Sequence, residues 1–514
     1  IFKNIKNSNK VDLSKNLPQR KPLIKKEEDI EKDKEVKKKE VAVKKEVEKT
    51  VTFTTKSSFI YPQKKPAIYK ASTEEVEKSS VLNQKDFTRA KETIKFIKDK
   101  KWNSALKSAS KVKDREFRNL ITWMYLKTTR NGASFSEYKN FIEQNNNYPR
   151  INRIRFLAES KIYLRNNSPT SIINWFDKYP PLGGMGKIKL AEAYLEKGQV
   201  EKVGELIKEG WETASISKND LGYYRAKFKK FIDSEDHIKR ADYLAWEKKY
   251  WDLKRMLKYL PKDQRALYNA RQILMSNSYG VDNAISKVPE YLKKDPGLEF
   301  DRLRWRNRRG RLEGSLEILY RNSIKTEEQM VRPDKWWEQR ESVVRSLIYK
   351  KRYKTAYKIS SEHALSAGPS FAEAEWLSGW IALTFLNSPE YAINHFQNFY
   401  NNVGYPISLA RGAYWLGASY EKLNEEQLSK NFYSESAKFP MTYYGQLAFN
   451  KINPGGNFEL KDESFFDKDY EKEFKKNKLI RHIILLKELN ATQLGKDIFK
   501  HLADLNIEKG SEVL

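Results

Sequence analysis

Few side chains in this sequence occur in patterns that support catalysis or metal binding. The chain of 514 residues contains no cysteine, which excludes thiol nucleophiles, disulfides, iron–sulfur clusters and cysteine-ligated zinc from its chemistry. Its five histidines are scattered singly, and no pair has the i,i+4 spacing of a helical metal site. We interpret each of them as an ordinary core or surface residue: His237, His363, His395, His482 and His501. A metalloenzyme is therefore disfavoured.

A glycine-rich loop is a second possible site. Gly183-Gly184-Met185-Gly186 precedes a predicted helix, as a phosphate-binding loop would. It follows two prolines rather than a strand, and it lacks the Gly-Lys-Ser/Thr ending of a nucleotide-binding loop. We therefore predict an ordinary turn between helices.

The densest basic segment, residues 301–311, encloses a tryptophan. Guanidinium groups beside an indole would suit nucleic acid or an anionic glycan. The candidate binding residues are Arg302, Arg304, Trp305, Arg308 and Arg311. On a helix Arg304, Arg308 and Arg311 share one face, so the alternative is a solvated basic face with ion pairs between repeats.

The composition points to an anionic partner or surface. Lys and Arg number 98 against 68 Asp and Glu, a formal net charge of +30. Nucleic acid, anionic lipid and an acidic cell-wall polymer all fit this charge. No run of about 18 apolar residues occurs, so we expect no transmembrane segment. The sequence begins at Ile1 without an apolar signal-peptide core, and we expect any signal peptide to have been removed or never included.

The pattern along the chain predicts three parts. Residues 1–83 are Lys/Glu-rich with too few apolar side chains to form a core, so we predict a disordered tether. Residues 84–440 read as short amphipathic helices separated by Gly, Pro and Asn, with small residues and aromatics on their inner stripes. This predicts an all-α superhelical solenoid of degenerate, tetratricopeptide-like helical hairpins. Residues 441–514 are expected to form a short helical domain.

Three blocks carry a resemblance to a known family. They are residues 371–383, 407–417 and 442–448, and weaker matches precede them at 117–123, 295–305 and 336–345. Together they resemble the superhelical U-shaped region of soluble lytic murein transglycosylases, over residues 84–448, with the tail similar to the family's linker domain. The landmarks of the resemblance are Trp376, Gly379, Trp380, Arg411, Tyr414, Trp415, Tyr444, Gly445 and Gln446.

The resemblance implies a periplasmic scaffold that engages peptidoglycan strands and needs no metal or organic cofactor. Enzymes of the family cleave the bond between N-acetylmuramic acid and N-acetylglucosamine without water, leaving a 1,6-anhydro end, through one Glu of a lysozyme-like domain. The Glu-Ser block and the later Gly-Leu-Met-Gln block of that domain do not occur here in that arrangement. Glu159-Ser160 resembles the Glu-Ser block only superficially, and we assign it no catalytic role. We expect no catalytic residue in this chain and a catalytic domain that is separate or missing.

Two alternatives come from other functional classes. One is a tetratricopeptide-like adaptor for proteins, which would need a consistent 34-residue spacing that the sequence lacks. The other is a basic helical-repeat protein for RNA, which would need a repeated base-reading position in each hairpin. We therefore expect peptidoglycan rather than nucleic acid as the partner.

Overall fold

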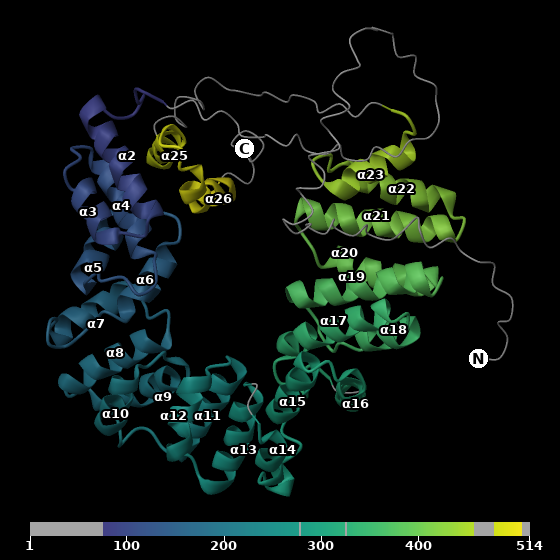
Figure 1. The fold of residues 1–514 in the computed structure, drawn as a ribbon, viewed down its shortest axis with the longest axis horizontal. Coiled ribbons are helices and arrows are strands. Elements are labelled where there is room, and N and C mark those ends of the chain that lie inside the picture. The colour runs from purple at the N-terminus through teal and green to yellow at the C-terminus, as the bar shows by residue number, and fades with distance from the viewer. Residues whose placement is uncertain (1–75, 277–278, 324–325, 457–476, 506–514) are drawn as a thin grey trace, which may run out of the picture. The chain divides into compact units, whose positions relative to one another are not determined.

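The computed structural model describes residues 76–276, 279–323, 326–456 and 477–505 (Figure 1). Within these ranges every regular element is a helix and no strand occurs, which confirms the all-α class. The described helices belong to one unit, Glu74–Leu514. Of the expected tether, residues 1–75 lie outside the described part of the chain.

The first half of the described chain consists of short helices with two 3₁₀ turns among them. Its elements are α2 Gln84–Lys98, α3 Trp102–Ala109, α4 Arg115–Leu126, α5 Phe135–Gln144, α6 Ile151–Glu159, α7 Pro169–Lys178, α8 Gly184–Glu196, η3 Val200–Lys202, α9 Val203–Thr213, α10 Lys218–Lys227, α11 Ser234–Trp246, α12 Tyr250–Met256, η4 Leu257–Tyr259 and α13 Lys262–Leu274.

The second half contains the longest helices. Its elements are α14 Val281–Ser286, η5 Glu290–Leu292, α15 Pro296–Arg308, α16 Leu312–Asn322, α17 Pro333–Tyr349, α18 Tyr353–Ser361, α19 Gly368–Phe385, α20 Pro389–Asn401, α21 Pro406–Lys422, α22 Glu426–Ala437, α23 Tyr443–Ile452, α25 Lys478–Glu488, η6 Thr492–Gly495 and α26 Lys496–Leu505.

Helices that follow one another in the chain pack on one another as hairpins. The pairs α8 with α9, α19 with α20 and α21 with α22 make the most extensive contacts of this kind. Four hydrophobic clusters follow one another along the described chain, and side chains such as Tyr194 and Trp380 contact two of them. A solenoid of hairpins, in which each repeat buries its apolar face on its neighbours, is therefore confirmed.

Close packing requires glycine at two of the predicted landmarks. A Cβ added at Gly379 would lie 2.8 Å from the Phe396 ring of α20, and one added at Gly445 would lie 2.1 Å from the carbonyl oxygen of Phe439. Neither gap admits a methyl group without movement of a buried ring or of the backbone. At Gly379 the missing side chain lets α19 approach α20 closely, and at Gly445 it leaves room for the turn between α22 and α23.

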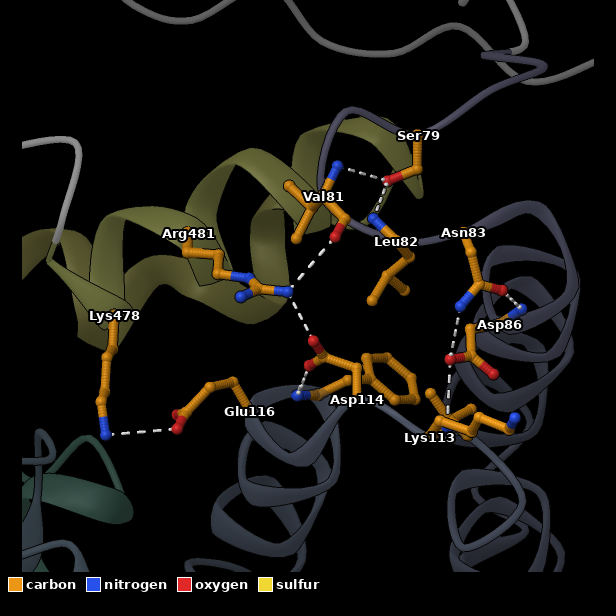
Figure 2. Close-up of polar contacts among 12 residues, drawn as sticks. Ser79, Val81, Leu82, Asn83, Asp86, Lys113, Asp114, Glu116, Lys478 and Arg481 are labelled. Atoms are coloured by element: carbon orange, nitrogen blue, oxygen red, sulfur yellow. Dashed lines mark hydrogen bonds and ion pairs between the residues drawn. The ribbon is translucent and has the colours of Figure 1, made fainter.

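The C-terminal helices α25 and α26 pack on the first helices of the described chain. Leu485 of α25 and Ile498 of α26 share a hydrophobic cluster with Phe117 of α4. Figure 2 shows the polar contacts at one edge: Arg481 forms an ion pair with Asp114, and Lys478 Nζ lies 3.2 Å from Glu116. Residues more than 360 positions apart in the sequence are thus held together.

The segment before α2 takes part in this packing. Ser80 donates its backbone N–H and its hydroxyl to Glu488 of α25, at 2.8 and 2.6 Å, and Leu82 is buried. Arg481 also donates to the carbonyl oxygen of Val81 at 3.2 Å (Figure 2). Residues 76–83 therefore differ from the unpacked tether that was expected up to residue 83, because α25 supplies partners that the local sequence does not reveal.

The boundary expected at residues 440 and 441 falls inside a packed region. Helix α23 contacts α21 and α22 extensively, so it continues the preceding array rather than joining α25 and α26. Among the described helices, none combines the length and the apolar character needed to cross a bilayer.

Candidate binding site on α19, α21 and α23

The predicted basic segment does not form one exposed binding surface. Arg304 is only 5% exposed, because its guanidinium turns inward to Asp301 at 3.0 Å. Asp301 is itself fully buried and accepts a hydrogen bond from Arg271 at 2.9 Å. Burial lowers the pKa of Arg304, against the effect of the Asp301 carboxylate. Arg304 is therefore buried beside Asp301 of its own helix and does not face a ligand.

The other residues of this segment are also engaged within the protein. Arg308 donates to the carbonyl oxygens of Leu274 and Met275 at the end of α13, at 2.5 and 2.9 Å. Arg311 covers the ring of the half-buried Trp305, 4.8 Å from its centroid. Arg302 is half-buried, and burial lowers its pKa, with Arg306 and Arg321 adding to the effect. These contacts within the protein do not favour a binding site at this segment.

The predicted landmarks, in contrast, converge on three neighbouring helices. We call six of them the aromatic–arginine cluster: Trp376 and Trp380 of α19, Arg411, Tyr414 and Trp415 of α21, and Tyr444 of α23. All six side chains are half-buried. Aromatic rings from successive hairpins therefore form a continuous group that still reaches solvent.

Trp376 lies at the centre of the aromatic–arginine cluster. Its ring is parallel to that of Trp380, with centroids 6.0 Å apart and an angle of 7° between the planes. The ring of Trp415 meets it edge-on at 6.4 Å. The Arg411 guanidinium lies over the Trp376 ring, 4.4 Å from its centroid, a geometry that favours the cation.

An exposed edge continues the cluster at the first turns of α21 and α23. Tyr443 is 69% exposed, and its ring lies 5.2 Å from that of Tyr444. Tyr405 and Met441, which lie just before these two helices, and Ile407 in the first turn of α21 are exposed as well. Gln446, the last landmark, is exposed, and its side-chain amide donates to the carbonyl oxygen of Pro440 at 3.0 Å.

A buried carboxylate on α19 precedes Trp376. Glu375 lies 2.8 Å from His363 Nε2 and 2.8 Å from His395 Nδ1, and it accepts a hydrogen bond from Asn398 at 3.1 Å. Although burial opposes ionisation, the two histidines lower the pKa of Glu375 to about 2. His395 continues the network to Tyr357 of α18 at 3.0 Å. Side chains of α18, α19 and α20 are thereby joined, and the carboxylate stays ionised at neutral pH.

This network was missed in the sequence because its members are far apart in it. His363 and His395 lie 12 and 20 residues from Glu375, so neither has a helical spacing to it. The available signal was Glu375 itself, a charged residue on the apolar stripe of a predicted helix. In the described part of the chain, no set of three His, Asp or Glu side chains has the arrangement of a metal site.

The arrangement is suited to binding rather than to proton transfer. Aromatic faces contact the apolar faces of ring-shaped ligands, and a guanidinium pairs with carboxylates or phosphates. The aromatic–arginine cluster and the adjoining Tyr443 therefore present aromatic rings and a guanidinium at one surface.

The chain was compared with family models, with curated proteins and with solved structures, and only the solved structures gave matches. No protein-family model and no curated protein matches the chain. Among solved structures, the chain is similar to the 70-kDa soluble lytic transglycosylase SLT70 from Escherichia coli, at 12% identity and a TM-score of 0.45, over 84% of this chain and 67% of that chain. The complex of the 70-kDa soluble lytic transglycosylase with bulgecin A gives the same values. An identity of 12% and a TM-score of 0.45 indicate a similar helical arrangement and assign no function to this chain.

Proposed function

We propose that this chain is a scaffold of the soluble lytic murein transglycosylase type, which engages peptidoglycan strands in the periplasm. The aromatic–arginine cluster and the adjoining Tyr443 would form the contact surface. The observation that carries the proposal is the Arg411 guanidinium over the Trp376 ring, with the parallel ring of Trp380 next to it, so that a cation and aromatic rings lie side by side. Peptidoglycan presents sugar rings along its glycan strands and carboxylates on its stem peptides, and each has a complementary group here.

The charge of the chain supports the same partner. A formal net charge of +30 attracts an anionic polymer, and such attraction weakens as salt shortens the screening length. Binding to peptidoglycan should therefore combine a salt-dependent part with a part that depends on the aromatic–arginine cluster.

We do not propose that the described residues cleave glycan bonds. A general acid for this reaction needs a raised pKa and access to the glycosidic oxygen. Glu375 fails the first condition, because its pKa of about 2 leaves no proton to donate at neutral pH. Glu159 has a pKa raised by burial to about 7, but it is 3% exposed and binds backbone amides with both oxygens. Cleavage is therefore assigned to a separate catalytic domain.

Pelleting of the purified chain with sacculi tests the proposed function. Arg411→Gln and Tyr443→Ala should each lower the bound fraction at moderate salt by about threefold or more, because they remove the cation and the exposed ring. Tyr349→Ala is the matched control, since Tyr349 is 79% exposed at the end of α17 and lies outside the cluster. Thermal melts should show that all three variants fold.

Three results would argue against this proposal. Equal pelleting of the parent chain and both variants would show that the aromatic–arginine cluster and Tyr443 do not contribute to peptidoglycan binding. Binding that is unchanged between low and about 0.5 M salt would exclude a charge-driven contribution. Release of 1,6-anhydro muropeptides by the chain alone would contradict the assignment of cleavage elsewhere.

A further inference from the structure

We propose that a cavity at the turns before α3 and α5 binds an anionic monosaccharide unit, a sugar ring that carries a carboxylate or a phosphate. The cavity has a volume of about 440 Å³ and is lined by residues 100–104, by residues 130–132 and by Tyr125 of α4. Small-ligand sites start at about 300 Å³, so the cavity has room for one ring and its substituents. It shares no residue with the aromatic–arginine cluster.

Three cationic side chains line this cavity: Lys100, Lys101 and Arg130. Lys101 has one distant carboxylate, Asp99, at 4.0 Å. Within the described ranges, no ion pair involves Lys100 or Arg130. Three cations with a single carboxylate nearby give the cavity a positive potential, and a guanidinium binds carboxylate and phosphate oxygens with two hydrogen bonds.

Aromatic side chains form the apolar part of the cavity. The ring of Trp102 lies 5.6 Å from that of Tyr125, with an angle of 47° between the planes. Trp102 is half-buried, so one region of its ring remains open to a ligand. Asn103 and Ser104 lie beside it and provide polar groups for sugar hydroxyls.

The hydroxyl of Tyr125 in the cavity wall provides the observation that points to a ligand. Tyr125 is 7% exposed and lines the cavity. Its oxygen accepts a hydrogen bond from the Gly132 N–H at 2.9 Å. In the described part of the chain, no group accepts the hydroxyl proton of Tyr125. The hydroxyl proton can therefore be donated into the cavity, where an anionic oxygen would accept it.

The aromatic geometry favours a sugar over a nucleotide base. The two rings are tilted, so they cannot enclose a planar base between parallel faces. A sugar ring needs only one face, together with hydrogen-bonding groups at its rim.

Isothermal titration calorimetry on the whole chain tests the site. The ligands are glucuronate, glucose 6-phosphate, glucose and adenosine monophosphate. The first two show whether the site prefers a carboxylate or a phosphate on the sugar. At least one of the two anionic sugars should bind at least tenfold more tightly than glucose and more tightly than the nucleotide. Arg130→Gln should weaken that binding by at least tenfold, and Tyr125→Phe should weaken it without changing the fold by circular dichroism.

The matched control is Arg165→Gln. Arg165 is exposed and lies 5.1 Å from the centroid of the Tyr163 ring, away from the cavity. This variant should bind like the parent chain. Equal affinity for glucose, tighter binding of the nucleotide, unchanged binding in Arg130→Gln, or no heat with either anionic sugar up to about 20 mM would overturn the proposal.

Discussion

The carboxylate of Glu159 caps a helix of the next hairpin: its Oε2 accepts a hydrogen bond from the N–H of Gly183, at 3.0 Å. Its other oxygen accepts from the N–H of Leu182, directly before α8. A Cβ at Gly186 would lie 2.6 Å from this carboxylate. The glycine-rich loop is therefore an anion cradle that is occupied by the protein's own side chain, which confirms an interhelical turn and explains its glycines.

Glu159 should make stability depend on pH near neutrality. Burial raises its pKa from 4.5 to about 7, against the lowering effect of the backbone N–H donors. A carboxyl group with a raised pKa stabilises the fold fully below pH 4.5, and this contribution is lost as the pH rises through 7. The free energy of unfolding is to be measured in urea at pH 5 and at pH 8. The difference between the two values should be smaller in Glu159→Gln than in the parent chain, because glutamine resembles the protonated acid and does not titrate. An unchanged slope in this variant would contradict the assignment.

Replacement of Glu159 by alanine should destabilise the chain more than replacement by glutamine. The N–H groups of Leu182 and Gly183 would lose their acceptor, at a cost of about 2 kcal/mol. Urea unfolding measures the difference, and equal stability of the two variants would show that the cap contributes little.

Glu375→Gln should destabilise the packing of α18, α19 and α20. Glutamine offers one acceptor where the carboxylate serves three donors, so the cost is about 2–3 kcal/mol at neutral pH. Because the pKa of Glu375 is lowered to about 2, its contribution is present above pH 4.5 and is lost as the pH falls toward 2. The difference in free energy of unfolding between the variant and the parent chain, measured in urea, should therefore become smaller as the pH falls in that range. A difference that stays constant would argue against an ionised carboxylate.

His482 should make the docking of α25 sensitive to acid. Its Nε2 lies 2.8 Å from the Tyr148 hydroxyl, and burial lowers its pKa from 6.5 to about 4 despite the nearby Glu116. The neutral imidazole stabilises the docking above pH 6.5, and this contribution is lost as the pH falls through 4. Hydrogen exchange should show falling protection of α25 in that range. His482→Phe should remove this pH dependence, and an unchanged profile would contradict the role of His482.

Trp336→Ala should cost more stability than Trp380→Ala. The landmark residues Trp376, Trp380, Tyr414 and Trp415 are all half-buried. The fully buried tryptophans are Trp123, Trp211 and Trp336. Truncation of Trp336 should cost about 3–5 kcal/mol, and truncation of Trp380 less. Denaturant midpoints measure both, and the reverse order would contradict the packing described here.

The hairpin architecture could be predicted because its signals are local. Helix α19 ends at Phe385, and the following Asn387 has a φ of 49°, at the Asn-Ser-Pro stop that the sequence indicates. The Gly and aromatic stripe of this helix likewise predicted close packing, which the contact of Gly379 with Phe396 confirms.

Long-range pairings could not be predicted in this way. The sequence around Arg304 does not reveal that this side chain is buried beside Asp301. Arg271, which binds Asp301, lies on α13, about 30 residues earlier in the chain. The same holds for Arg481 and Asp114, which are 367 residues apart. A single sequence contains no local period that links such positions.

Fluorine NMR of the chain labelled with fluorotryptophan tests the central claim most directly. Peptidoglycan glycan fragments should shift the resonances of Trp376, Trp380 and Trp415, assigned by single Trp→Phe variants, because ligand contact changes the surroundings of these half-buried rings. The resonance of the fully buried Trp211 should not move. Shifts that leave all three cluster tryptophans unchanged, or that affect Trp211 equally, would contradict a glycan surface on α19, α21 and α23.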